Sequence, residues 1–295
     1  MNYDQFKDLS CYEEFEVQCT LAGISKIDVL KKYAHIINGY YFFISKDGIF
    51  NWFDLEGNHI EDPSILKEIK EEHILKDITK CIIPDSVTRI GDCAFSYCES
   101  LKEITIPDNV INIGDCAFSY CKSLTSVIIP NGVTYIGDET FYYCASLTSI
   151  SIPDGVTNIG DGAFSYCRSL TSINIPDGIT CISGGTFWSC KSLEEITIPD
   201  GVKSIGYSAF ANCKSLKEIT IPDNMTYIGN WAFSYCKSLT SVIIPDSVKS
   251  IGDSAFYDCE SLKEVIFKGK TLEEVKRIYN YPFGIEDKSI IKCES

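Results

Sequence analysis

The chain has 295 residues, 45% of them hydrophobic, and a formal net charge of −15 from 41 acidic and 26 basic side chains. This composition excludes a disordered chain, and the negative charge repels phosphate backbones, so nucleic acid is a poor partner. The first residues show no basic region followed by an apolar run, and no apolar stretch approaches the roughly 20 residues that cross a bilayer. We therefore expect a cytoplasmic protein, with a secreted or cell-surface location as the alternative.

Residues 1–73 do not repeat and predict a small α+β unit. Its expected elements are a helix over 25–37 with Ser25 as N-cap, a β-hairpin over 40–53 with Asp47-Gly48 as a two-residue turn, and a helix over 63–74. Because the terminal repeats of an array would otherwise expose their core, we expect this unit to cap the array that follows. A separate activity in residues 1–73 is the alternative.

From residue 74 onward, one pattern recurs every 23 residues. Proline stands at 84, 107, 130, 153, 176, 199, 222 and 245. Phenylalanine stands at 95, 118, 141, 164, 187, 210, 233 and 256, and cysteine at 98, 121, 144, 167, 190, 213, 236 and 259. Three independent series with one period indicate a solenoid in which each repeat forms one coil.

The coil over 124–146, LTSVIIPNGVTYIGDETFYYCAS, shows what each repeat forms. It begins with an alternating apolar strand that ends at Pro130, and a second short apolar segment follows an Asn-Gly turn. Phe141 and Cys144 are three residues apart, which suits a single helical or 3₁₀ turn. Stacked at about 4.8 Å, such coils predict an α/β solenoid over 74–267, mainly parallel β with short helical turns.

This unit resembles the BspA-like, or Treponema pallidum-type, leucine-rich repeat, whose pattern is LxxIxIPxxVxxIGxxAFxxCxS. Residues 101–121, LKEITIPDNVINIGDCAFSYC, match every marked position, and the resemblance extends over about 78–267. The departures are conservative in volume: Ile78, Cys81, Ser183 and Met225. The resemblance implies a leucine-rich repeat protein with roles in adhesion and host-surface binding.

Residues 268–295 leave the repeat, since Lys268 stands where proline is expected. The segment 271–279 predicts a helix with Thr271 as N-cap and Glu274 three residues later, the pattern of a capping box. We expect a helical C-terminal cap.

Catalytic chemistry finds little support. The three histidines, His35, His59 and His73, all lie in the N-terminal unit, away from the cysteine series, and no nucleotide-binding or hydrolase motif occurs. The cysteine series predicts buried thiols that pack as small hydrophobes, and the absence of a CxxC pair argues against zinc. We expect no enzymatic activity, no cofactor and no metal.

Two further patterns allow sharper interpretations. Cys93 and Cys116 are predicted to be exposed neighbours about 5 Å apart, within reach of a disulfide, although a reducing cytosol favours two free thiols. The Asp residues that follow proline, and those of the recurring Gly-Asp pairs, would stack from coil to coil, and stacked carboxylates could bind calcium. Turn formation by the Asp side chains is the favoured interpretation.

The strand positions that point away from the core form the first candidate binding surface. They are Glu103, Thr105, Ser126, Ile128, Ser149, Ser151, Ser172, Asn174, Glu195, Thr197, Glu218, Thr220, Ser241 and Ile243, with Glu264 and Ile266 in the last coil. Strand propensity alone would also place Thr and Ile here.

An aromatic series next to the cysteines forms the second candidate surface: Tyr97, Tyr120, Tyr143, Tyr166 and Tyr235, joined one position earlier by Tyr142, Trp188 and Tyr257. Exposed Tyr and Trp are enriched at binding hot spots, but these rings could equally stack and rigidify the edge. The resulting hypothesis is a non-catalytic scaffold that binds a protein partner through one of these surfaces. The alternatives are a secreted or surface adhesin, and an effector whose activity resides in residues 1–73.

Overall fold

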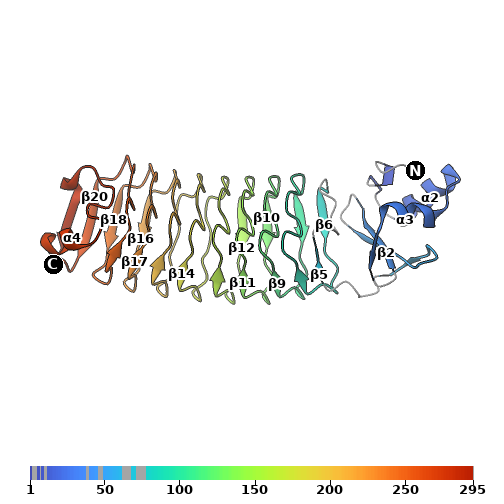
Figure 1. Ribbon diagram of the computed structural model, residues 1–295, viewed down its shortest axis with the longest axis horizontal. Helices are drawn as coiled ribbons and strands as arrows, with labels where there is room; N and C mark the ends of the chain where they lie inside the picture. The colour runs from blue at the N-terminus through green and yellow to red at the C-terminus, as the bar shows by residue number, and fades with distance from the viewer. Residues whose placement is uncertain are drawn as a thin grey trace.

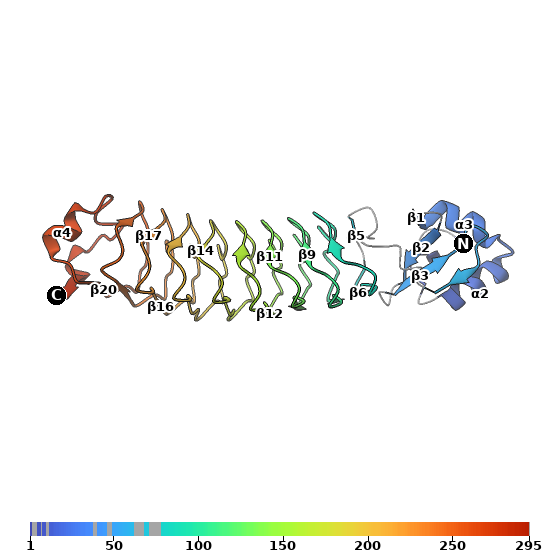
Figure 2. The ribbon, with the colours of Figure 1, turned by 90° about the horizontal axis from the view of Figure 1, so that it is seen from below.

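The computed structural model describes residues 1, 5–6, 8–9, 12–37, 40–45, 49–61, 68–70 and 78–294. Stacked coils form a long rod, with a small α+β unit at its N-terminal end and a short helix and strand at its C-terminal end (Figures 1 and 2). The parallel β-solenoid predicted from the 23-residue period is confirmed, and helix contributes little to it.

On one side of most coils a strand pairs parallel with its equivalent 23 residues away, and we call these pairings the first ladder. Where pairing is regular, between β16 and β18 for example, three residue pairs are in register; between β12 and β16 it is reduced to bridges from Asn174 to Thr197 and from Thr197 to Thr220. The strands are β6 (Lys80–Ile82), β8 (Glu103–Thr105), β10 (Ser126–Ile128), β12 (Ser149–Ser151), β16 (Glu218–Thr220), β18 (Ser241–Ile244) and β20 (Glu264–Lys268).

A second parallel ladder is formed by the short apolar segment after each Pro turn. Each of its strands has two residues and ends in a buried isoleucine. They are β5 (Glu68–Ile69), β7 (Arg89–Ile90), β9 (Asn112–Ile113), β11 (Tyr135–Ile136), β13 (Asn158–Ile159), β14 (Cys181–Ile182), β15 (Ser204–Ile205), β17 (Tyr227–Ile228) and β19 (Ser250–Ile251). The helix predicted over 63–74 is therefore wrong at β5, and 63–67 and 71–74 lie outside the described residues.

We call the third side of each coil the turn side. It contains consecutive turns where the sequence predicted a single helical or 3₁₀ turn. In the coil that contains Phe95, consecutive turns run over 92–97, and the N–H groups of Cys93, Phe95 and Tyr97 donate to carbonyls of the next coil at 2.7–2.8 Å. Cys93 and Tyr97 hold left-handed φ angles of 55° and 60°. Because these donors point along the rod rather than back along their own chain, an α-helix cannot form.

Identical side chains stack on the turn side to build the core. Phe141 and Phe164 lie parallel with ring centroids 5.6 Å apart, and the other phenylalanines of the series repeat this contact. From Cys121 to Cys236, each thiol of the series also donates a hydrogen bond to a backbone carbonyl: Cys167 Sγ lies 3.2 Å from the Phe141 carbonyl oxygen. The predicted packing role of these cysteines is confirmed, and the hydrogen bond adds to it.

The N-terminal unit is an antiparallel sheet with two helices. The predicted hairpin is confirmed by antiparallel pairing over 41–53. Its last bond before the turn runs from Ser45 N–H to Ile49 O, so three residues separate the bonded pair where a two-residue turn was predicted. The predicted turn residues, Asp47-Gly48, lie outside the described residues. The helix predicted over 25–37 stops at Tyr33, and Ser25 occupies its N-cap without a side-chain bond. The elements are α2 (Tyr12–Ala22), α3 (Lys26–Tyr33), β1 (His35–Ile37), β2 (Tyr40–Ile44), β3 (Phe50–Phe53) and β4 (His59–Ile60).

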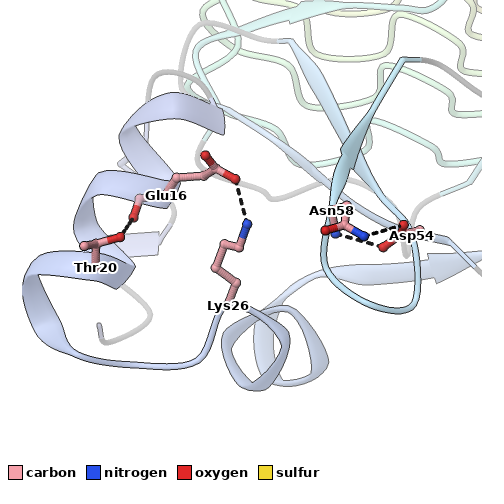
Figure 3. Close-up of polar contacts among 5 residues, drawn as sticks. All are labelled: Glu16, Thr20, Lys26, Asp54 and Asn58. Atoms are coloured by element: carbon pink, nitrogen blue, oxygen red, sulfur yellow. Dashed lines mark hydrogen bonds and ion pairs between the residues drawn. The ribbon is translucent and has the colours of Figure 1, made fainter.

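Both faces of the central strands β2 and β3 are buried, since side chains alternate along a strand. Phe42 and Trp52 belong to the same apolar cluster as the solenoid core, whereas Phe43 and Phe53 pack with the helices. Figure 3 shows the polar contacts on the outside of the unit, where Lys26 of α3 donates to Glu16 of α2 at 2.7 Å. The sheet therefore covers apolar surface at the N-terminal end of the rod.

The C-terminal segment combines a helix, α4 (Leu272–Arg277), with a strand, β21 (Ile291–Glu294). The predicted capping box is confirmed: Glu274 N–H donates to Thr271 Oγ1, and Thr271 N–H donates to Glu274 Oε2 at 2.8 Å. β21 pairs parallel with β20 and was not predicted. The C-terminal end is thus closed by a strand as well as by the expected helix.

Candidate functional site

The outward positions of the first ladder form a continuous surface, which we call the strand face. All fourteen predicted positions in coils 103 to 243 are exposed except Ser241, which is half-buried. Ile128 leaves 74% of its surface exposed, whereas the flanking Val127 and Ile129 are buried. The alternation predicted from the LxxIxI segment therefore places these side chains as expected.

Two adjoining depressions mark the middle of the strand face, with volumes of about 410 and 450 Å³. Both are lined by Ser172, Glu195 and Glu218, and they coincide with the coils in which strand pairing is reduced to bridges. Glu194 is paired with Lys217 at 2.7 Å, but no ion pair holds Glu195 or Glu218 within the described part of the chain. Two unpaired carboxylates therefore face solvent at the most irregular part of the face.

The aromatic series divides into stacked and exposed members. Tyr97, Tyr120, Tyr143 and Tyr166 form a column, with successive ring centroids 4.6, 5.2 and 5.3 Å apart. Tyr120, Tyr143 and Tyr166 are half-buried, whereas Tyr97, at one end of the column, is exposed. Tyr97, Trp188, Tyr235 and Tyr257 are exposed. The stacked tyrosines match the rigidifying alternative, and the exposed rings keep a surface available.

The column tyrosines also carry a conformational cost. Tyr120 and Tyr143 hold φ angles of 59° and 58°, in the left-handed region that side chains with a Cβ disfavour. Ring stacking between coils offsets part of that cost. A guanidinium adds to the stack, because Arg168 lies 4.9 Å from the Tyr143 ring centroid.

Cys93 and Cys116 are half-buried rather than exposed, which corrects the predicted exposure, and both are free thiols. Burial, together with smaller contributions from the neighbouring Cys93 and Glu139, raises the pKa of the Cys116 thiol to about 12. Such a thiol stays protonated near neutral pH and is a poor nucleophile.

The recurring Gly-Asp carboxylates bond from coil to coil. The N–H of Asp161 donates to Asp138 Oδ1 at 2.8 Å, and Asp115 accepts from Asp138 in the same way at 3.0 Å. The turns after proline are instead closed by backbone bonds, such as Val133 N–H to Pro130 O at 3.0 Å. The turns predicted after proline are therefore present, but the bonds that close them come from the backbone. The coil-to-coil bonds of the Gly-Asp carboxylates were not predicted from the sequence.

Two of the three histidines contact aromatic rings. His59 stacks on Tyr12 with ring centroids 3.6 Å apart, and burial lowers its pKa. His35 lies against Phe42, and His73 lies outside the described residues. In the described ranges, no group of three or more His, Cys, Asp or Glu is placed to hold a metal ion.

One further hollow, on the turn side, was not predicted. It has a volume of about 690 Å³, and Gly162 and Gly185 lie at its floor, with Tyr142 and Trp188 beside them. We call it the Gly162/Gly185 groove. The sequence signal for this groove is glycine at the same repeat position in two consecutive coils, where other coils have a side chain.

Coils of 23 residues that stack Leu, Ile, Phe and Cys on themselves define a leucine-rich-repeat solenoid. The BspA type leucine rich repeat region matches residues 72–194 and 180–285, which together make up most of the chain. The chain therefore belongs to the BspA-type leucine-rich repeat family, as its repeat pattern predicted. No curated protein matches it closely enough to serve as a relative.

Solved structures of bacterial proteins are similar. The T. pallidum leucine-rich repeat protein is 22% identical, with a TM-score of 0.53, and the match covers 86% of this chain and 97% of that one. A leucine-rich repeat protein from Eubacterium ventriosum is 22% identical, with a TM-score of 0.50 and coverage of 80% and 78%. A leucine-rich cell surface protein from Faecalibacterium prausnitzii is 26% identical, with a TM-score of 0.38 and coverage of 89% and 95%. The first two likenesses show a shared fold.

Over the described residues, no helix combines the length and the apolar character that a bilayer span requires.

Proposed function

We propose that the chain is a non-catalytic scaffold that binds a protein partner through the strand face, centred on Glu195 and Glu218. The observation that carries this proposal is the pair of adjoining depressions that both carboxylates line, without ion pairs among the described residues. Repeat solenoids present such extended faces for recognition, and unpaired carboxylates on an acidic chain favour a partner with a basic patch.

The aromatic edge is the second candidate surface. Its stacked members, Tyr120 and Tyr143, are held by their neighbours, so a structural contribution accounts for them. The exposed Tyr97 and Tyr235 remain available to a partner. The strand face is favoured because its side chains are free of such neighbours, and it would be equally accessible inside the cell or at its surface.

The test is affinity capture with the wild-type chain beside two double variants, Glu195→Lys/Glu218→Lys and Tyr120→Ala/Tyr143→Ala. A third variant, Asp154→Lys/Asp177→Lys, makes the same charge change at exposed turns beyond the strands. We expect the first variant to lose a partner that the wild type and the turn variant retain. If all variants capture every wild-type partner, neither surface binds.

A further inference from the structure

The Gly162/Gly185 groove lies on the turn side, on another side of the coil from the strand face. Its lining runs from Asp115 to Ser208, a distance of four coils. At the usual spacing of stacked strands this is about 19 Å, the length of about six extended residues. An open groove of about 690 Å³ with this length suits a linear ligand.

The groove exists because two side chains are missing from one repeat series. The equivalents of Gly162 and Gly185 all have positive φ, and they are Cys93, Cys116, Glu139, Ser208, Trp231 and Ser254. The backbone therefore does not require glycine at this position. A Cβ on Gly185 would meet nothing closer than 3.7 Å, so packing does not require it either. A Cβ on Gly162 would lie 3.3 Å from Glu139 Cγ, so Gly185 rather than Gly162 leaves an open floor that a side chain could occupy.

Aromatic rings form the walls of this floor. Tyr142 and Trp188 occupy equivalent positions two coils apart, about 9.6 Å, with the small Ser165 between them. Tyr166 contacts both, with ring centroids 5.6 Å from Tyr142 and 5.1 Å from Trp188. The ring of Tyr166 therefore lies between the two, and a cation can approach the parts of Tyr142 and Trp188 that line the groove, within the range of roughly 6 Å over which cation–π attraction acts.

The charge of the groove selects the sign of its ligand. Asp115, Asp138, Glu139 and Asp161 line it, and no basic side chain does. Arg168 lies over Tyr143 and Tyr166 and is not part of the lining. Because acceptors outnumber donors, the chemistry suits an ammonium group better than a neutral sugar, whose hydroxyls need both.

We propose that the Gly162/Gly185 groove binds an extended lysine-rich segment of a polypeptide. Lysine ammonium groups lie against Tyr142 and Trp188, and neighbouring lysines lie along the carboxylates. Partial burial, with contributions from the neighbouring Tyr120, raises the pKa of the Tyr142 phenol to about 12. This surface is separate from the strand face and does not depend on binding there.

The probe is a fluorescein-labelled hexapeptide of alternating lysine and glycine, titrated with the full chain and followed by fluorescence anisotropy at physiological salt. The same peptide with acetyl-lysine tests the need for charge. We expect Trp188→Ala and Tyr142→Ser to weaken binding about 5- to 20-fold, as loss of a cation–π wall predicts. Both variants should fold, since Ala211 and Ser165 occupy the same repeat position in other coils.

A groove-filling variant and a matched control complete the test. Gly185→Trp places an indole on the floor, as Trp231 does at the equivalent position with a φ of 60°, and should abolish binding. Trp231→Ser removes an indole outside the groove, where Ser208 and Ser254 are the equivalents, and should leave affinity within about twofold of wild type. The proposal is overturned if Trp188→Ala binds as wild type does, if Trp231→Ser weakens binding equally, or if acetyl-lysine peptide binds as well.

Discussion

The side of the rod that carries the first ladder, which we call the strand side, and the turn side hold the same coils together by different means. On the strand side, ordinary parallel pairing lapses around Asn174 and Thr197 without breaking the rod. On the turn side, the Phe rings, thiol bonds and coil-to-coil N–H bonds recur through these same coils, as at Phe187 and Cys190. The comparison indicates that the turn side fixes the stacking of coils, which leaves the strand side free to vary for binding.

Alkaline pH should cause the largest decrease in the free energy of unfolding, because it acts on all buried thiols at once. Burial raises the pKa of Cys144, Cys190 and Cys213 well above 9.0, whereas the same thiols ionise near that value when the chain unfolds. Their stabilisation is therefore complete below pH 9 and is lost as pH rises above it, by about 1.4 kcal/mol per thiol per pH unit.

Urea unfolding from pH 7 to pH 10 measures this loss. Cys190→Ser should reduce the slope above pH 9, since it removes one titrating thiol. Constant stability up to pH 10 would show that the turn-side thiols are not protected in the folded chain.

The second prediction compares one core side chain from each side. Phe164→Ala removes a ring stacked between Phe141 and Phe187 and should cost about 3–5 kcal/mol. Ile173→Ala lies on the strand side where pairing lapses, and should cost about 2 kcal/mol. Chemical denaturation gives both values, and a larger loss for Ile173→Ala would reverse the comparison.

The third prediction concerns the carboxylates that bond between coils. Asp138→Ala removes the acceptor for the N–H of Asp161 and should destabilise the chain by about 1 kcal/mol. The control is Asp154→Ala, at an exposed turn that the backbone closes, and should change stability by less than about 0.5 kcal/mol. Equal thermal midpoints for the two variants would show that the coil-to-coil carboxylate bonds do not stabilise the turn side.

The smallest expected effect is a difference between two variants of one tyrosine. Tyr120→Ala loses stacking and keeps the left-handed strain, whereas Tyr120→Gly loses stacking and relieves it. The Gly variant should therefore be more stable than the Ala variant by about 1 kcal/mol, the reverse of their order in regular structure. Thermal denaturation of the pair decides whether stacking sustains the strained backbone.

The sequence predicted the solenoid, its inward and outward strand positions and the capping box, because each of these follows from local spacing. Val127 and Ile129 alternate, and Thr271 precedes Glu274 by three residues. The turn side escaped prediction since the spacing of Phe141 and Cys144 fits a helical turn and consecutive turns alike. Only the destination of the backbone N–H groups, which is the next coil, distinguishes them.

The same limit applies to the candidate sites. The two-residue strands of the second ladder, such as β11, are too short to show an alternating pattern. The Gly162/Gly185 groove depends on what neighbouring coils place beside an absent side chain, and one coil considered alone does not reveal it. Likewise, sequence gives Tyr120 and Tyr143 no preference between stacking and exposure, which their partners in adjacent coils decide.

The translational equivalence of the coils has a consequence for folding. A chain that looped out one whole unit of 23 residues would still superpose Phe on Phe and Cys on Cys where the coils meet again, but the excluded unit would lose its own burial. That lost burial, rather than any mismatch between coils, favours the full stack. The sheet that presents Phe42 and Trp52 at one end, and the pairing of β21 with β20 at the other, fix where the stack begins and ends.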